Sequence, residues 1–207
     1  MIAIVIGIVL VVWSVWGYFA SRAEQVAYRV VRKVHGYEIR QYDSRIVAQT
    51  KVQGEYRQSM SVGFRILARY IFGGNSKRES IAMTAPVTSQ SRVSQKIAMT
   101  APVTVGGDGE AHVVSFSMPS SYTMATLPAP LDACITIVEV PEQTMAVLVC
   151  AGYRTERRIQ KMKETLLAKL QKDGVNVKGA PLYAGYTGPG TPPWMTHNEV
   201  MVEIVEA

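Results

Sequence analysis

Alternation of apolar and polar positions predicts two pairs of β-strands along the chain. Residues 37–42 and 46–52 alternate in this way and are separated by a short polar turn. Residues 135–140 and 145–150 show the same pattern, with a turn that begins at Pro141. The second pair follows the first at an offset of 98 residues without a gap, and a glycine ends each pair. We therefore expect two copies of one β-hairpin.

A segment with the apolar periodicity of a helix follows each strand pair. Residues 59–72 carry an apolar arc about 200° wide, roughly twice the ~100° that a helix needs to face one core. Half of this arc can pack on a sheet, and the other half needs a second partner: a flat apolar ligand, a loop or another subunit. The second helix is expected from Thr155, as N-cap, to Asp173, just before Gly174, with an apolar stripe of ordinary width.

Extended segments follow both helices. They lie at residues 81–88 and 113–118 in the first half and at residues 182–186 and 199–205 in the second. The order strand, strand, helix, strand, strand therefore occurs twice. Such a duplication predicts an α+β domain with pseudo-twofold symmetry, in which mostly antiparallel strands form one curved sheet or open barrel with two helices packed on it.

The first apolar run, residues 2–20, contains no charged residue. As a helix it would span about 28 Å, close to the thickness of the hydrocarbon core of a bilayer. A cleaved signal peptide is the alternative, but no basic residue precedes the run and the cleavage site after it is poor. We therefore expect a transmembrane anchor at residues 1–22, a connector at 23–35 and one domain at 36–207.

Basic residues follow the apolar run and none precedes it, so the positive-inside rule predicts a domain on the cytoplasmic side of a membrane. The chain has two cysteines, Cys134 and Cys150, which as reduced thiols fit that side. Both lie in the second predicted hairpin and could face each other across it, and a bond between them would require an oxidising compartment. We expect a single-pass protein with a cytoplasmic domain, and a periplasmic domain is the alternative.

Charge and motifs exclude several functions. The formal net charge is +6, but the basic residues are scattered and form no basic face with stacking aromatic residues, so nucleic acid is not an expected partner. The chain lacks the common hydrolase, nucleotide-binding and zinc-site motifs, and its three histidines form no recognisable triad pattern. No enzyme motif is therefore recognised in the sequence.

The most distinctive motif is IAMTAPVT, at residues 81–88 and again, identical over eight positions, at 97–104. Its proline disfavours the middle of a sheet, so we expect it at an edge or a bulge. With YEIRQYDSRIVAQT at residues 37–50 and HNEVMVEI at 197–204, it resembles the SOUL haem-binding family, some bacterial members of which double this motif. FSMPSSY, LPAPLD and YAGYTGP match further blocks in the family's order, and the resemblance covers about residues 28–207.

The resemblance implies a distorted antiparallel β-barrel of two pseudo-twofold ββαββ repeats flanked by two helices, here with an N-terminal transmembrane helix added. It also implies reversible binding of haem or another tetrapyrrole without turnover. A bacterial member with the anchor at residues 2–20 would sit in the inner membrane and act as a haem buffer, carrier or sensor.

Haem is a flat apolar disc with two propionates, so its site needs an apolar platform, cations and, in some proteins, an axial ligand. In the SOUL family the ring is thought to lie against the first helix, with basic residues near the propionates. The resemblance therefore implies a platform of Met60, Phe64, Leu67 and Ile71, with Arg65 and Arg69 as propionate partners. On a helical wheel, Arg65 points about 100° away from Phe64, so its side chain would have to reach round the helix.

Among possible axial ligands, His35 is the expected imidazole because it lies just before the first strand. His197 is expected to be a structural or surface residue, and His112 to be solvated in a glycine-rich loop. Met83 and Met99, one in each IAMTAPVT copy, could ligate iron through sulfur, although methionine more often fills a core. Some relatives bind haem by hydrophobic contact without an axial histidine.

Two other functions stay open. The domain could be a sensor or hydrolase for another amphipathic small molecule, as in the related effector-binding folds of bacterial transcription regulators. That function requires a pocket between the two halves, lined by acidic and aromatic groups such as Glu199 and Tyr186. The domain could instead be a membrane-anchored interaction module without a small ligand, in which case a subunit would cover the spare face of the first helix.

Overall fold

The computed structural model describes residues 13, 24–92, 111–152, 155–187, 191–192 and 195–205. In chain order its elements are β1 (Glu24–Gln25), β2 (Tyr28–Val34), β3 (Tyr37–Tyr42), β4 (Arg45–Gln53), α2 (Tyr56–Ile71), β5 (Thr84–Ala85), β6 (Val87–Arg92), β7 (Ala111–Ser117), β8 (Ile135–Val140), β9 (Gln143–Cys150), α3 (Glu156–Lys172), β10 (Val177–Gly185) and β11 (Asn198–Ile204). Apart from Trp13, the expected anchor at residues 2–20 lies outside the described ranges, as does the second IAMTAPVT copy. Among the described residues, no helix has the length and apolar character needed to cross a membrane.

The sequence pattern located the two strand pairs and both helices to within three residues, whereas β10 begins five residues before the expected segment 182–186. β3 and β8 have the expected bounds, and β4 and β9 begin one and two residues before them. α3 has Thr155 as its N-cap, as expected, whereas α2 begins three residues earlier than the apolar arc indicates. Gly54 and Gly152, the glycines expected to end the strand pairs, have φ angles of +117° and +100°, which residues with a side chain rarely adopt. Pro86 lies between β5 and β6, outside the middle of a strand.

The pairing of these strands differs from the two expected hairpins. β3 pairs with β9 and β4 pairs with β8, so each of these strands has one neighbour from the other half of the chain. The second neighbours, β2 of β3 and β7 of β4, come from the same half. Ile39 lies opposite Ala146, and Ala48 lies opposite Ile137. Ile137 and Ala146 are the positions that follow Ile39 and Ala48 by 98 residues, so the two pairings are related by the repeat. Alternation shows which residues are extended and which face they share, but contacts between distant segments decide the partner.

This pairing also decides whether the two cysteines face each other. Because β8 pairs with β4 and not with β9, Cys134 and Cys150 do not face each other across a hairpin. Both are free thiols.

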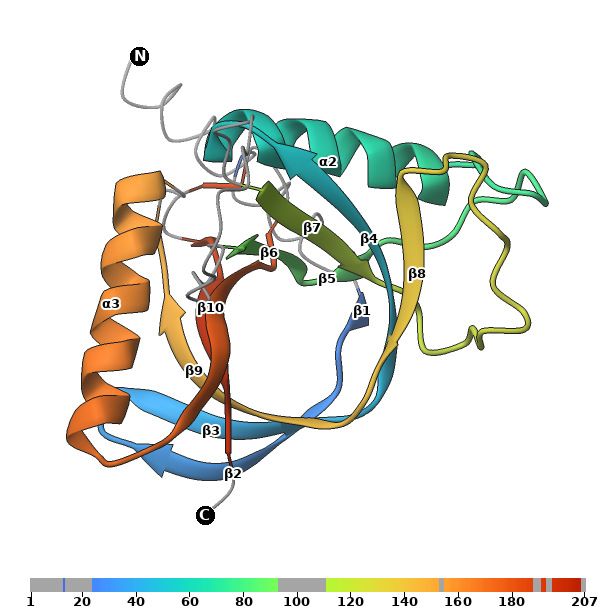
Figure 1. Ribbon diagram of the computed structural model, residues 1–207. Coiled ribbons are helices and arrows are strands. Elements are labelled where there is room, and N and C mark those ends of the chain that lie inside the picture. Colours follow the sequence, from blue (N-terminus) through green and yellow to red (C-terminus); the bar gives the residue numbers. More distant parts are fainter. Residues whose placement is uncertain are drawn as a thin grey trace, which may run out of the picture.

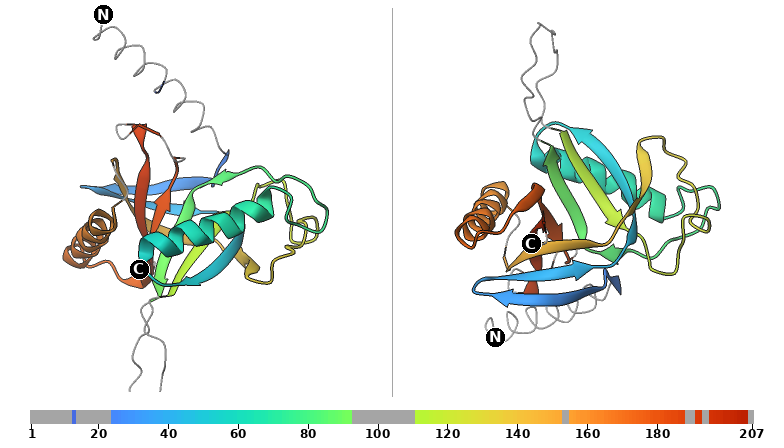
Figure 2. Two further views of the ribbon diagram at one scale, coloured as in Figure 1. Left: turned by 90° about the horizontal axis from the view of Figure 1, so that it is seen from above. Right: turned by 60° about the horizontal axis from the view of Figure 1, so that its bottom comes forward.

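Nine strands form one sheet in the order β2-β3-β9-β11-β10-β6-β7-β4-β8. The sheet is not closed, since its edge strands β2 and β8 are not bonded to each other. The expected α+β class with one large, mostly antiparallel sheet and two helices is confirmed, whereas a distorted antiparallel barrel is not. Tyr28–Val34 lies in the range expected as a connector but forms the edge strand β2. Figure 1 shows the sheet curling round, with α2 across its top and α3 along its left side, and Figure 2 shows both helices outside the curve.

Each helix covers a separate apolar core. α2 packs on β4 and β7, and α3 packs on β9, β10 and β11. Gly63 allows α2 to approach β7, because a Cβ at this position would lie 2.5 Å from Cγ2 of Val114. The core under α2 includes Ala48, Leu67, Ile71 and Phe116, the core under α3 includes Ile39, Leu166, Leu170 and Val200, and a third cluster includes Tyr42, Met145, Tyr186 and Met201.

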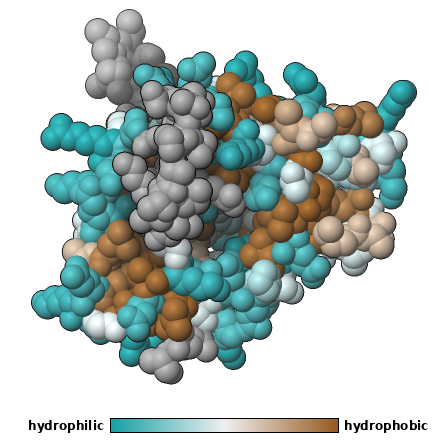
Figure 3. Space-filling model, viewed as in Figure 1, coloured by the Kyte–Doolittle hydropathy of each residue, from teal (hydrophilic) through white to brown (hydrophobic). Residues whose placement is uncertain are grey.

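The surface seen from the side of Figure 1 is mixed. Figure 3 shows hydrophilic side chains along most of its outline and a hydrophobic area over β8 and the adjoining loop. Leu131 and Met124, from the loop between β7 and β8, are exposed.

Candidate functional site

A cavity of about 580 Å³ lies beside the first turns of α2, where the core under α2 meets the core under α3. Ligand pockets usually have volumes of about 300–1,000 Å³. The described residues that line it come from α2, β6, β7, β10 and the start of α3; they are Tyr56, Arg57, Met60, Phe64, Val87, Ser89, Val114, Thr155, Glu156 and Tyr183.

The sheet buries two of the four residues of the expected apolar platform on α2. Met60 and Phe64 are partly exposed and line the cavity, and the Phe64 ring meets Phe116 edge-on at a centroid distance of 5.3 Å. Leu67 and Ile71 are 0% and 1% exposed and belong to the core under α2. These two residues therefore offer no surface to a ligand, because their part of the wide arc faces the sheet.

The arginines selected from the sequence lie outside this cavity. Arg65 and Arg69 are exposed, and Nε of Arg65 donates to the carbonyl oxygen of Ser61 on its own helix at 3.4 Å. The cavity is lined instead by Arg57, which precedes Met60 by three residues and therefore shares its helix face. A helical wheel would have identified Arg57, but the helix was expected to begin only at residue 59.

His35 is too far from the cavity to ligate a molecule inside it. It is exposed in the turn between β2 and β3, where its carbonyl oxygen accepts a hydrogen bond from Nζ of Lys169 at 3.4 Å. Lys169 lies in the last turn of α3, whereas Glu156, at the cavity, begins that helix. Thirteen residues of α-helix separate the two sites by about 20 Å.

The other histidines do not line the cavity either. His112, expected in a solvated loop, is buried in β7, and its ring lies edge-on to Tyr56 at 5.6 Å. It is buried because it shares a face of β7 with Val114 and Phe116, under α2. Within the described ranges, no group of three or more His, Cys, Asp or Glu residues is placed to hold a metal ion.

Of the two methionines in the repeated motif, only the first lies within the described residues. Met83 is partly buried against the core under α2, and Met99 lies outside the described residues.

Glu199 forms the centre of a buried polar cluster. Its Oε1 accepts hydrogen bonds from Nη1 of Arg40 and from Nε2 of His197, both at 2.8 Å, and its Oε2 accepts one from the Tyr186 hydroxyl at 2.6 Å. Glu199 and Arg40 are 1% and 3% exposed, and Arg40 also pairs with Glu38 at 2.8 Å. The buried carboxylate is therefore neutralised within the protein.

The ionisation of this cluster follows from its contacts. Burial alone would raise the pKa of Glu199, but hydrogen bonds from His197, Tyr186 and Arg40 and the charge of Arg40 outweigh it, so the pKa is lowered. Burial, together with Tyr42 and Glu199, raises the pKa of Tyr186. Neither Glu199 nor Tyr186 is among the described residues that line the cavity beside α2. Arg40, His197 and Tyr186 therefore take up hydrogen-bonding positions around the Glu199 carboxylate that a bound ligand would need.

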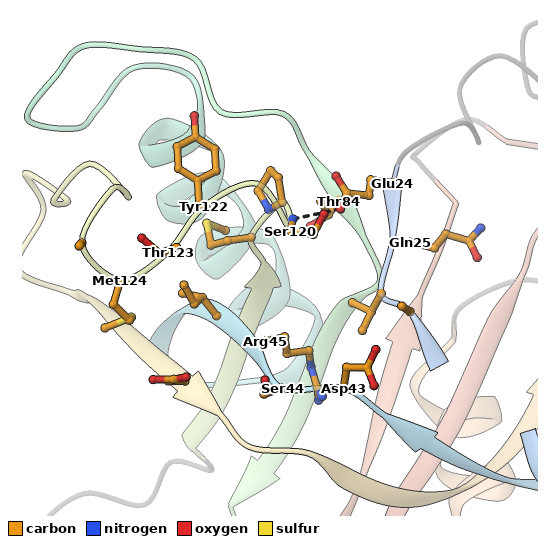
Figure 4. A pocket seen from close by; sticks show the side chains of 17 residues that line it. Glu24, Gln25, Asp43, Ser44, Arg45, Thr84, Ser120, Tyr122, Thr123 and Met124 are labelled. Atoms are coloured by element: carbon orange, nitrogen blue, oxygen red, sulfur yellow. Dashed lines mark hydrogen bonds between the residues drawn. The ribbon is translucent and has the colours of Figure 1, made fainter. Parts of the chain in front are cut away.

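A second large cavity, of about 650 Å³, was not anticipated from the sequence. Figure 4 shows Asp43, Ser44 and Arg45 along one side of it, the loop with Tyr122 and Met124 on the left, and Glu24 on the right. The Glu24 carboxylate accepts a hydrogen bond from the backbone N–H of Ser120 at 3.0 Å, which lowers the Glu24 pKa.

Comparison with known proteins assigns the family. The model of the SOUL heme-binding protein family matches residues 23–203. The chain belongs to this family. It is 30% identical over 155 residues to Heme-binding protein 2 of Homo sapiens and 27% identical to that of Mus musculus, covering 74% of this chain and 71% of each relative.

Solved structures show the same fold at very low sequence identity. The crystal structure of the EcmrR C-terminal domain matches with a TM-score of 0.59 at 9% identity, over 87% of this chain and 99% of that one. A crystal structure of a hydrolase from Listeria innocua matches with a TM-score of 0.53 at 8% identity, over 84% of this chain and 94% of that one. At such identities the likeness concerns the fold alone.

Proposed function

We propose that this protein binds haem or a related tetrapyrrole reversibly, without turnover, in the cavity beside the start of α2. One observation carries the proposal: Met60 and Phe64, on the helix that the family resemblance indicates, keep apolar surface that faces a cavity of about 580 Å³. Membership of a heme-binding family and relatives named Heme-binding protein 2 support the choice of ligand.

The lining residues suit the two parts of a tetrapyrrole. The ring would lie against Met60, Phe64 and Val87, and removal of this apolar surface from water would supply most of the affinity. Arg57 lies at the same cavity and would pair with a propionate. Since none of the described histidines lines the cavity, apolar contact and charge would hold the ligand without an imidazole from these residues.

We further propose that residues 2–20 tether this domain to a bacterial inner membrane, with the domain on the cytoplasmic side. The support is the length and apolar character of the run and the basic residues that follow it. A tethered domain that binds without turnover would serve as a buffer, carrier or sensor of haem at the membrane.

The test is an optical titration of the full chain, in a non-ionic detergent, with haemin. We expect a saturable change in the Soret band with one haemin per chain and a dissociation constant of about 1 μM or tighter. Phe64→Asp should weaken binding at least tenfold, because it places a carboxylate on the apolar platform. Leu131→Asp, at an exposed position outside the cavity, is the matched control and should leave the affinity unchanged.

The outcomes separate the ligand from its site. Absence of a saturable Soret change in the unaltered protein would refute haem binding. Equal affinities of Phe64→Asp and Leu131→Asp would leave haem binding standing and remove it from this cavity.

A second pair of variants tests the charge at the site. Arg57→Gln should weaken haemin binding by about three- to tenfold, whereas Arg65→Gln should not change it, because only Arg57 lines the cavity. His35→Ala should leave both the affinity and the Soret position unchanged, because His35 lies at the other end of α3. A larger effect of Arg65→Gln than of Arg57→Gln would show that the propionates lie on the outer face of α2.

A further inference from the structure

The edge strand β2 combines exposed apolar side chains with basic ones. Its first six residues are all exposed, and Tyr28 and Val31 are 41% and 54% accessible to solvent. The same strand carries Arg29, Arg32 and Lys33, and no acidic residue lies within it or in the turn that follows it. β2 therefore presents a strip that is basic and partly apolar.

The fold leaves most of this charge without a carboxylate partner. Lys33 lies 3.5 Å from Glu38, but 75% of the Lys33 side chain is exposed, and such surface pairs are weak. Arg29 donates to the neutral amide oxygen of Gln41. Among the described residues, no carboxylate lies within 4 Å of Arg29 or Arg32. Both guanidinium groups are therefore open to an anionic partner outside the protein.

The turn after β2 extends the basic strip to α3. Nζ of Lys169, in the last turn of α3, donates to the carbonyl oxygen of His35 at 3.4 Å, and Lys172 is exposed in the same turn. Asp173 follows them and accepts a hydrogen bond from the Tyr37 hydroxyl at 2.9 Å. Figure 1 shows β2 along the bottom of the molecule beside the end of α3, with α2 at the top, and Figure 2 shows β2 as the outermost strand on its side.

The chain before β2 holds this strip close to the proposed membrane anchor. Residue 24 follows the end of the apolar run, at residue 20, by four residues, which span at most about 14 Å. Glu24 is fixed to the domain, because it pairs with Thr84 in the β1–β5 ladder and accepts a hydrogen bond from the N–H of Ser120. β2 begins only four residues after Glu24. A bilayer that holds the run would therefore lie near β2.

Charge argues against a second copy of β2 as the partner. In an antiparallel pairing centred on Val31, Arg29 of each copy would lie opposite Lys33 of the other, and like charges directly opposite are destabilising. The register of β2 against β3 also shifts between Val30 and Arg32. Bulges and basic side chains are the features that protect an edge strand from pairing with another chain. An anionic lipid surface, in contrast, would attract the same charges.

We propose that β2 docks on the anionic lipid headgroups of the membrane that anchors the chain. Arg29, Arg32 and Lys33 pair with headgroup phosphates, and Tyr28 and Val31 enter the interfacial region, where aromatic side chains are favoured. This inference rests on the tether proposed above for residues 2–20. It is independent of the proposed haem site, because no residue of β2 lines that cavity.

The experiment places a reporter on β2. The full chain is reconstituted in nanodiscs of phosphatidylcholine, or of equal parts phosphatidylcholine and phosphatidylglycerol. An environment-sensitive fluorophore is attached at Val31→Cys in a chain that also carries Cys134→Ser and Cys150→Ser. The matched control has the fluorophore at Thr136→Cys, an exposed position on the other edge strand, β8. We expect a blue shift of the emission from position 31 in anionic discs only, and no shift from position 136.

Charge variants test the contacts with the headgroups. Arg32→Gln should lower the ratio of docked to undocked chain about fivefold, the factor expected for one basic residue at an anionic surface. Arg65→Gln, which removes an exposed arginine from α2, is the matched control and should leave the ratio unchanged. Salt at about 1 M should release β2, because it shortens the screening length to about 3 Å.

Three results would overturn the proposal. Equal emission from position 31 in both kinds of disc, with the chain retained in both, would exclude docking and leave the tether standing. A shift that grows with the number of chains per disc, and not with lipid charge, would assign β2 to a second copy. Loss of the chain from both kinds of disc would refute the tether and the docking together, while haemin titration reports on the haem site separately.

Discussion

Arg40 and Arg45 lie five residues apart, on β3 and β4, and both guanidinium groups contact Tyr42, but their surroundings differ. Arg40 donates to the Tyr42 hydroxyl at 3.3 Å and pairs with Glu38 and Glu199, each at 2.8 Å. Arg45 meets the Tyr42 ring and Gln143, and no carboxylate of the described chain pairs with it. Arg40 is buried and neutralised by the fold, whereas Arg45 is partly buried and has no paired carboxylate among the described residues.

The difference between the two surroundings also appears in the pKa values of the two guanidinium groups. Burial alone would lower the pKa of Arg40, yet Glu199 and Tyr42 more than compensate and raise it. Burial lowers the pKa of Arg45 with little to oppose it. Arg40 lines neither of the two large cavities, whereas Arg45 lines the cavity of about 650 Å³. The first arginine is held in an ion-pair network within the sheet, and the second is not.

The largest effect is expected from breaking the paired cation. Arg40→Met should lower the free energy of unfolding by about 3–5 kcal/mol, because it leaves the buried Glu199 carboxylate without its counter-ion. Urea denaturation measures the change. Adding Glu199→Gln to this variant should restore part of the loss, since the buried negative charge is then removed. A loss below about 1 kcal/mol in Arg40→Met would mean that the pair is not a structural element.

A smaller effect is expected from acid, and its sign follows from Glu199. The folded state lowers the Glu199 pKa below its ordinary 4.5, so this group stabilises the fold above that pH. The stabilisation is lost as the pH falls through the folded-state pKa. Urea denaturation from pH 6 to pH 3 should therefore show a shallower loss of stability in Glu199→Gln than in the unaltered protein. Parallel curves would contradict the lowered pKa.

The smallest effect is expected from the unpaired cation. Arg45→Met should change the free energy of unfolding by no more than about 1 kcal/mol, or even stabilise the protein, because it strands no carboxylate and removes a buried, unpaired donor. The measurement is the same urea denaturation. A loss as large as that of Arg40→Met would place Arg45 among the structural residues and remove the contrast between the two.

Local structure could be predicted because it depends on neighbours along the chain. The alternation of Tyr37–Tyr42 and Ile135–Val140 specified two strands to the residue, and Thr155 marked the start of α3. The family could also be recognised, because its sequence blocks occur in order along one chain. The helix that contributes Met60 and Phe64 to the cavity was identified for the same reason.

The composition of the candidate site could not be predicted in the same way. Leu67 and Ile71 share the apolar arc with Phe64, and only the position of the sheet decides that they are buried and Phe64 is not. Arg57 was missed because the arc began after it. His35 precedes the first predicted strand, but its distance from the cavity depends on where α3 packs.

The sequence by itself determined the strands β3, β4, β8 and β9, the two helices, the 98-residue offset and the family, because periodicity and motifs are properties of contiguous residues. Only the tertiary structure decided that β3 pairs with β9 and β4 with β8, that Glu199 meets Arg40, and that Arg45 meets no carboxylate. The physical reason is that pairing and the cost of a buried charge depend on which distant residues the fold brings within a few ångströms.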